Sequence, residues 1–323
     1  MTESYFSHKM NEKRRLGAKS VKSLFVGQIR EDHDKLMSSH GLYGDGYKNQ
    51  PPIHSAFAEA IRPALQNSLG SYITKSYCEN MGVDFFELFK LNSRGLRSDE
   101  FTDDHAGKRH ILFAGCSNTF GVGLPEELCW PRITYETVSQ DAPSSGYFNV
   151  ARPGATMSEI FIQITNYIEA FGTPDIVFLM LPDAERENLN DKDPRYAQYL
   201  TTQLYRCLAQ RLDVNGSRLL VFSWDARANM DYRGKAQLKD YDPRRYMKNN
   251  FYQYSIAERE EFLYQSSKKI EDGYGIYKDF VFTAMDDMHP GIAEHKFYAD
   301  FATDIYAGKV LSSTPPIMDE DGV

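Results

Sequence analysis

The chain has 323 residues, of which 41% are hydrophobic and 25% are charged, as is usual for a globular protein of one large domain or two smaller ones. Its formal net charge of −8 argues against nucleic acid or an anionic membrane surface as the usual partner. The first residues lack the apolar core of roughly 7–15 residues found in signal peptides, and no apolar run reaches the ~20 residues that span a bilayer. We therefore expect no signal peptide and no membrane span, and a cytoplasmic or virion-associated location.

The first 91 residues (1–91) are predicted to form an N-terminal extension of helices and loops that packs on the domain after it. Residues 41–52 are rich in turn-forming residues, and residues 54–69 carry apolar side chains at helical spacing. The apolar residues between 85 and 91 indicate a face that other parts of the protein cover. The four cysteines lack C-x-x-C spacing, which predicts free thiols and neither a disulfide framework nor a metal site (Cys78, Cys116, Cys129 and Cys207).

The segment from residue 110 to 124 contains the main candidate for a functional site. A short apolar run predicts a buried parallel strand that stops at Gly115, and small polar residues follow, among them Ser117. In open α/β folds this position puts the serine hydroxyl at the carboxyl edge of the sheet, where ligands bind. A phosphate loop is disfavoured because no lysine follows the glycines, and a G-x-S-x-G elbow because Thr119 replaces the second glycine. Cys116 is an alternative nucleophile, although we expect it to be a small buried thiol.

Further apolar runs predict the remaining elements of a sheet with crossover helices. The predicted fold is a three-layer α/β/α sandwich with a central parallel sheet, of flavodoxin-like type, over residues 92–311. Residues 226–279 form an insertion in this prediction, and residues 312–323 form a flexible tail. The expected strands cover 111–114, 174–181, 218–224 and 279–284. One expected helix begins at the capping box Thr156–Glu159, and the others cover 196–212, 256–269 and 294–306.

Two motifs in this framework resemble those of a known enzyme family. The run from Gly115 to Leu124 resembles the first block of the SGNH (GDSL-like) hydrolases, in the form G-x-S-x-T-x-G-x-G. Near the end of the chain, Asp286 and His289 have the D-x-x-H spacing of that family, in the same order along the chain. A D-x-x-H pattern alone is usually a solvated turn, but the conjunction of the two motifs favours a catalytic site. The resemblance extends over roughly residues 92–307.

The resemblance implies a catalytic triad and an SGNH-hydrolase fold. Ser117 would be the nucleophile, His289 the general base and Asp286 the residue that orients the imidazole. A serine hydroxyl attacks effectively only when a neutral imidazole takes its proton and a carboxylate steadies the resulting imidazolium. The resemblance implies neither a metal nor an organic cofactor.

The oxyanion hole is matched in part. Residues 147–156 resemble the second block of the family, a strand that ends in N-x-x-x-x-G, so the resemblance implies a further strand at 147–150. In that block the glycine amide, here that of Gly154, binds the oxyanion together with the amide of the nucleophile, here Ser117. The next block, G-x-N-D, is missing, because Pro182 and Asp183 follow the predicted strand. An anionic Asp183 would repel an oxyanion.

Several residues remain candidates for the missing donor or for contacts with substrate. A side chain at Arg186, Asn188 or Asn190 replaces the absent asparagine, or the hole has only two amides. Asn118, next to the nucleophile, and Asp183, after the predicted strand at 174–181, are further candidate contacts with substrate. Asp225 follows the predicted strand at 218–224, where it contacts substrate or caps a helix.

One segment upstream of the serine is also informative. Asn92, Gly95 and Arg97 have the N-x-x-G-x-R spacing that many SGNH-like proteins show shortly before their first block. The alternative interpretation is a turn with a surface arginine.

Together these features predict a serine esterase or acyl-hydrolase that acts on a small-molecule or carbohydrate ester. O-acetyl groups on carbohydrate are the expected substrate, because aromatic residues make up 13% of the chain, with 21 tyrosines, and such side chains often face sugars. Two alternatives remain open: a catalytically weak or inactive protein of SGNH fold that binds glycan or protein, and an O-acyltransferase that uses the same site. The oligomeric state is not predicted.

Overall fold

The computed structural model describes residues 76–84, 88, 90–92, 96–100, 108–142, 145–182, 205–224, 250–267, 274–286 and 288–310. The predicted loop at 41–52, the predicted helix at 54–69 and the predicted tail at 312–323 lie outside these residues. No helix among them is long and apolar enough to cross a bilayer.

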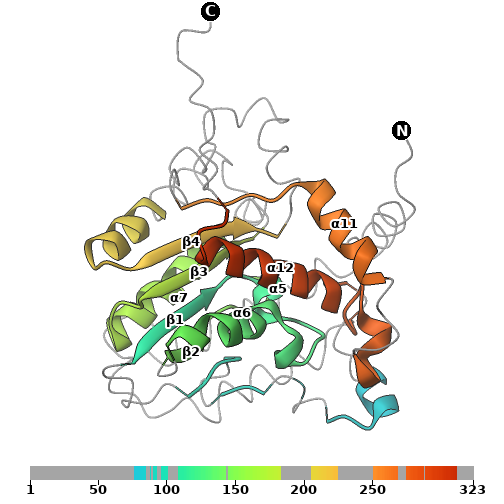
Figure 1. Cartoon of the computed structure of the whole chain (residues 1–323). Helices are drawn as coiled ribbons and strands as arrows, with labels where there is room; N and C mark the ends of the chain where they lie inside the picture. Colours follow the sequence, from blue (N-terminus) through green and yellow to red (C-terminus); the bar gives the residue numbers. More distant parts are fainter. Residues whose placement is uncertain are drawn as a thin grey trace, which may run out of the picture.

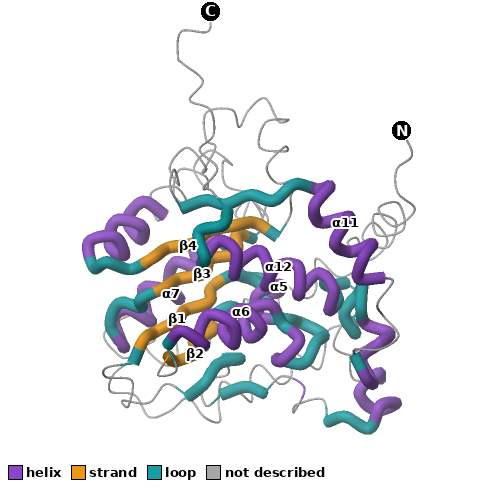
Figure 2. Tube along the Cα trace, in the orientation of Figure 1, coloured by secondary structure: helices purple, strands orange, loops and turns teal. Residues whose placement is uncertain are grey.

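A four-stranded parallel sheet forms the centre of the molecule (Figures 1 and 2). Its strands are β1 (Arg109–Ala114), β2 (Ser145–Asn149), β3 (Ile176–Leu181) and β4 (Arg218–Ser223), in the order β2-β1-β3-β4. These four predicted strands are thus present, and their unbroken apolar runs reflect burial on both faces of the sheet. After β1 the chain crosses to β2 on one side of β1, and after β2 it crosses back to β3 on the other side. The switch point of the sheet therefore lies between β1 and β3. Ligands of such sheets bind at the carboxyl ends of the strands near this point.

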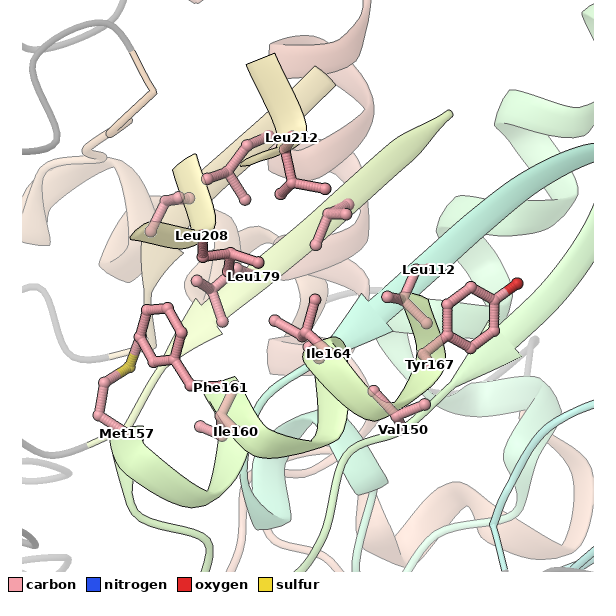
Figure 3. Packing of buried hydrophobic residues seen from close by; sticks show 14 of the residues in the cluster. Leu112, Val150, Met157, Ile160, Phe161, Ile164, Tyr167, Leu179, Leu208 and Leu212 are labelled. Carbon is pink, nitrogen blue, oxygen red and sulfur yellow. The ribbon is translucent and has the colours of Figure 1, made fainter. Parts of the chain in front are cut away.

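One face of the sheet is covered by α7 (Met157–Phe171) and by a helix over residues 205–214 (Figure 3). The predicted capping box at the start of α7 is confirmed: the Thr156 hydroxyl accepts a bond of 3.2 Å from the Glu159 amide, and the Glu159 carboxylate accepts one of 2.7 Å from the Thr156 amide. Gly216, with φ +73°, follows the 205–214 helix in the turn that the sequence predicts.

The opposite face is covered by α6 (Trp130–Val138) and α12 (Ile292–Tyr306), which lie side by side in front of the sheet in Figure 1. Trp130 of α6 packs its ring edge-on against Phe113 of β1 and Phe222 of β4. The helix predicted within the insertion is α11 (Ile256–Ser267), and it packs against α12. The three-layer α/β/α arrangement predicted from the sequence is therefore confirmed.

The strand predicted at 279–284 is wrong. The chain forms the 3-10 helix η6 (Gly275–Phe280) and then a bend that makes only one isolated β-bridge, between Thr283 and Pro290. Phe280 and Val281 are buried, so the apolar signal in the sequence came from packing of this loop and not from strand pairing. A short apolar run cannot distinguish these two cases. Other short helices are α5 (Ser117–Phe120), η2 (Glu126–Leu128), η3 (Ser139–Asp141) and a helix over residues 76–81.

A third apolar cluster lies beneath the loops at the carboxyl edge of the sheet. In it, Cys78 and Leu88 pack with Phe120, Leu124 and Met285. Residues that precede β1 in the chain therefore pack against two loops, one directly after β1 and one that contains Met285. Most of residues 1–91 lie outside the description, so the boundaries predicted for an N-terminal extension stay a prediction.

Candidate active site

Ser117 is the first residue of α5, directly beyond the carboxyl end of β1. The chain can turn so sharply here because Gly115 has no side chain: a Cβ at this position would collide with the Thr119 side chain and lie 3.0 Å from the Met180 carbonyl oxygen. The turn thus folds back over the boundary between β1 and β3, and Ser117 is 4% exposed. Figure 2 shows α5 at this edge of the sheet.

Asp286 and His289 form a hydrogen-bonded pair, as the sequence predicts. The bond joins His289 Nδ1 to Asp286 Oδ2, and Asp286 Oδ1 accepts the backbone amides of Met288 at 3.1 Å and His289 at 3.0 Å. In a neutral ring whose Nδ1 proton is donated to this carboxylate, the lone pair lies on the other ring nitrogen, Nε2. The His289 side chain is 22% exposed, whereas that of Asp286 is fully buried.

The environment keeps Asp286 ionised. Burial alone raises the pKa of this carboxyl, but the charge of His289, its hydrogen bond and the two backbone amides act in the opposite direction and prevail. The pKa of Asp286 therefore lies below its ordinary value. A carboxylate that is ionised at neutral pH and bonded to Nδ1 is the arrangement that stabilises an imidazolium.

The loop that follows Ser117 is in direct contact with the loop that carries Asp286. The Met285 amide donates to the Gly123 carbonyl at 3.0 Å, and a Cβ at Gly123 would lie 3.1 Å from the Asp286 amide nitrogen. Gly123 also has φ +77°, so both its conformation and its surroundings require glycine. Within the described part of the chain, no hydrogen bond joins the Ser117 hydroxyl to the His289 ring.

Gly154 lies in the loop between β2 and α7, with φ +79°, and a Cβ at this position would meet no atom within 4 Å. The loop is tied to the end of β1, because the Arg152 amide donates to the Gly115 carbonyl at 3.3 Å. Among the described residues, neither the Ser117 amide nor the Gly154 amide donates a hydrogen bond.

Asn149 connects the two loops that hold these amides. Its side-chain amide donates to the Thr119 carbonyl at 3.2 Å, and its side-chain oxygen accepts the Ala151 amide at 3.0 Å. Asn149 is 2% exposed, so the sequence motif N-x-x-x-x-G contains a structural tie as well as the glycine.

Not every candidate from the sequence can be placed. Asp183, Arg186, Asn188, Asn190 and Asp225 lie outside the described residues. Asn118 follows Ser117 on α5 and is 5% exposed, and Cys116 is fully buried. Among the described residues, no group of three or more histidine, cysteine, aspartate or glutamate side chains is arranged to hold a metal.

Arg97 is buried, so the interpretation as a surface arginine is wrong. It is 1% exposed and donates to four backbone carbonyls, three of them in the loop that follows Ser117. The N-x-x-G-x-R spacing from Asn92 to Arg97 was the feature of the sequence that pointed to this residue.

No feature of the sequence pointed to His295. It is fully buried, and its Nδ1 accepts the Trp130 amide at 3.1 Å. Burial, together with the charges of Arg97 and His289, lowers the pKa of His295 to about 3.

A second network of hydrogen bonds joins α11 to α12, the helix that follows His289 in the chain. Arg259 of α11 donates to the Glu294 carboxylate of α12 at 2.9 Å, and the Tyr298 hydroxyl donates to the same oxygen at 2.6 Å. The Tyr298 hydroxyl also lies 3.1 Å from the carbonyl of Trp224, just beyond β4. The network thereby fixes the helix after His289 to the carboxyl edge of the sheet.

No protein-family model matches the chain, and no curated protein matches it. Solved structures that are similar to it include TesA, with 15% identity and a TM-score of 0.39 over 61% of this chain and 98% of that one. Esterase EstA from Pseudoalteromonas sp. has 12% identity and a TM-score of 0.40 over 62% of this chain and 98% of its own. A member of the lipolytic G-D-S-L family from Veillonella parvula has 14% identity and a TM-score of 0.35, with 62% of this chain and 98% of that one covered.

Proposed function

We propose that the protein is a serine esterase of SGNH type, with Ser117 as nucleophile, His289 as general base and Asp286 as the residue that orients His289. The observation that carries this proposal is the contact between the two loops: the hydrogen-bonded Asp286–His289 pair is packed, through Met285 and Gly123, against the turn that begins at Ser117. Both lie at the carboxyl edge of a parallel sheet, where such folds bind their ligands.

In the proposed reaction, the Ser117 hydroxyl attacks the ester carbonyl while His289 Nε2 takes its proton. Asp286 stabilises the imidazolium without itself becoming protonated. His289 then returns the proton to the departing alcohol, and an acyl group remains on Ser117. Water, activated by the same histidine, hydrolyses this intermediate.

The amides of Ser117 and Gly154 bind the oxyanion in this mechanism. Each donor removed from a hole of this kind costs about 3 kcal/mol of transition-state stabilisation. Since the G-x-N-D block is missing from the sequence, a hole of two amides predicts slower turnover than a hole of three. A donor from Arg186, Asn188 or Asn190 would restore the difference.

We propose small acyl groups on carbohydrate as the substrate class. The aromatic content of the chain supports this class, since tyrosine offers an apolar face and a polar hydroxyl to a sugar. Two measurements test this proposal. Hydrolysis rates of acetyl, butyryl and octanoyl p-nitrophenyl esters test the preference for small acyl groups, and acetate release from acetylated oligosaccharides tests the preference for carbohydrate. Addition of a sugar alcohol distinguishes hydrolysis from acyl transfer, because only transfer diverts the acyl group from water.

The main test compares p-nitrophenyl acetate hydrolysis by the wild type, Ser117→Ala and His289→Ala. Each substitution should lower kcat by on the order of 10³-fold or more, because triad residues act together. Cys116→Ala is the matched control for the neighbouring thiol and should retain activity. A wild type that neither hydrolyses esters nor reacts with a fluorophosphonate would instead support a binding protein.

A further inference from the structure

We propose that Arg97 is a positioning residue for the turn that begins at Ser117. From its buried position it donates hydrogen bonds to backbone carbonyls of that turn. This inference rests on the proposed function, because it assigns Arg97 to the same reaction. Arg97 does not contact the reacting atoms in this proposal, and it acts through the backbone that carries the nucleophile and its oxyanion amide.

The contacts of the guanidinium group are directed at this turn. Nη1 donates to the carbonyls of Phe120, at 3.0 Å, and Gly121, at 2.6 Å. Nη2 donates to the carbonyl of Leu124 at 2.8 Å and to that of Leu88 at 3.2 Å. Three of the four acceptors therefore belong to the first eight residues of the segment that starts at Ser117.

The helix α5 is too short to hold the end of this turn by its own hydrogen bonds alone. The helix has only four residues, and it ends at Gly121 in a left-handed conformation with φ +77°. The Gly121 amide bonds back to the Ser117 carbonyl at 2.9 Å, and the Gly121 carbonyl accepts the Leu124 amide at 3.3 Å in addition to Arg97 Nη1. A charged donor forms a stronger hydrogen bond than a neutral amide, so the guanidinium adds to the bonds that the loop makes by itself.

Only an arginine side chain suits this arrangement. The planar guanidinium presents several N–H donors in a rigid fork, so one side chain can fix several carbonyls at once. Lysine keeps the positive charge but offers a single nitrogen, which cannot reproduce the fork. The ring of Phe120 also lies 5.4 Å from the guanidinium carbon, so the turn is held by both its backbone and a side chain.

The segment that precedes Arg97 is shaped to deliver this side chain. The Asn92 side chain accepts the Leu96 amide at 3.0 Å and donates to the Asp99 carbonyl at 3.0 Å, which closes a loop around Arg97. Asn149 holds the neighbouring Thr119 carbonyl at 3.2 Å. Asn149 and Arg97 thus bind the consecutive carbonyls of Thr119 and Phe120, at the end of α5 that is opposite to Ser117.

The test compares Arg97→Gln and Arg97→Lys with the wild type, and uses Arg132→Gln as the matched control. Arg132 is a partly exposed arginine that pairs with Asp99 and Glu136. Measurements are kcat and KM for p-nitrophenyl acetate, thermal unfolding, and the rate constant for fluorophosphonate labelling of each reactive site. A displacement of about 1 Å at a nucleophile costs on the order of 100-fold in rate. We therefore expect kcat and labelling to fall by about 100-fold in Arg97→Gln and by about 10-fold in Arg97→Lys, with KM almost unchanged, and no loss in Arg132→Gln.

Dividing the hydrolysis rate by the concentration of labelled Ser117 sites separates a positioning role from a simple loss of folded protein. If the folded fraction of each Arg97 variant reacts at the wild-type rate per site, the proposal is overturned. Should Arg97→Gln fail to fold, Arg97→Lys alone decides, because a folded lysine variant with wild-type kcat and labelling contradicts the need for the fork. A wild type that is not labelled at all overturns the proposed function as well, so the two failures are distinguishable.

Discussion

The two halves of the candidate site are built in different ways. The base half is local: Asp286 and His289 are three residues apart, and one carboxylate binds the imidazole and two amides of the same short turn. The nucleophile half is assembled from distant segments, since the turn at Ser117 is held by Arg97 from before the sheet and by Asn149 from β2. A local half tolerates changes elsewhere in the fold, whereas an assembled half depends on every segment that contributes to it.

The largest expected effect tests the local half. Asp286→Asn should lower kcat by on the order of 10⁴-fold, because the neutral amide no longer fixes the imidazole with its proton on Nδ1. The measurement is steady-state hydrolysis of p-nitrophenyl acetate. Asp304→Asn, which removes an exposed carboxylate of α12 paired with Lys309, is the control and should leave kcat unchanged. Equal activity of the two variants would contradict the role of Asp286.

The next largest effect concerns the oxyanion loop. Gly154→Ala places a side chain at φ +79° and should shift the amide, with a loss in kcat of about 10- to 100-fold. Gly216→Ala is a closely matched control: its φ is +73°, its Cβ also meets nothing within 4 Å, and it lies in the turn before β4. Both variants should lose about 1 kcal/mol of stability, measured by urea unfolding, but only Gly154→Ala should lose activity.

A smaller effect is expected for the tie between the two loops of the nucleophile half. Asn149→Ala leaves the Thr119 carbonyl and the Ala151 amide without their partner, at a cost of about 1–3 kcal/mol in stability. We expect a decrease of about 10-fold in kcat, since the turn keeps its contacts with Arg97. Asn215→Ala, which removes an exposed side-chain bond to the Arg211 carbonyl, should change neither property. An Asn149 variant with wild-type stability and kcat would show that the tie is dispensable.

The last effect concerns the dependence of stability on pH and leaves catalysis aside. In the folded protein His295 has a pKa of about 3, whereas an unfolded histidine binds a proton near pH 6.5, so the unfolded state binds more protons between these values. Stability is therefore expected to fall as the pH is lowered from about 6.5, by up to about 1.4 kcal/mol per pH unit from this one group. His295→Gln should flatten this slope, as measured by urea unfolding between pH 7 and pH 4. An unchanged slope would exclude His295 as its source.

Asp286 acts in a different pH window. Its folded-state pKa is lowered, so its carboxylate contributes stability above the unfolded pKa near 3.9, and this contribution is lost as the pH falls through the lower folded value. The effects of the two groups on stability are thus separated along the pH scale. Asp286→Asn should lower stability at every pH above about 3.9, and it should flatten the dependence of stability on pH only in the most acidic range.

The sequence by itself determined the framework of this protein. Apolar runs specified three of the four strands, and the resemblance of residues 147–156 to a family block indicated the fourth. The Thr156–Glu159 pattern specified the start of α7, and the short spacing of Asp286 and His289 specified their pairing. These features are local, because burial on both faces, a helix cap and a three-residue turn each leave a pattern within a few residues of the chain.

Only the tertiary structure decided the rest. The apolar residues near Phe280 and Val281 gave the signal of a strand, yet they pack as a loop, because burial alone does not reveal which partner covers a side chain. The burial of Arg97 and His295 likewise depends on residues far away in the chain, which supply the carbonyls and the helix amide that these side chains bind. A polar residue that is buried through distant partners has no periodic pattern in the sequence, since its environment is created only when the segments meet.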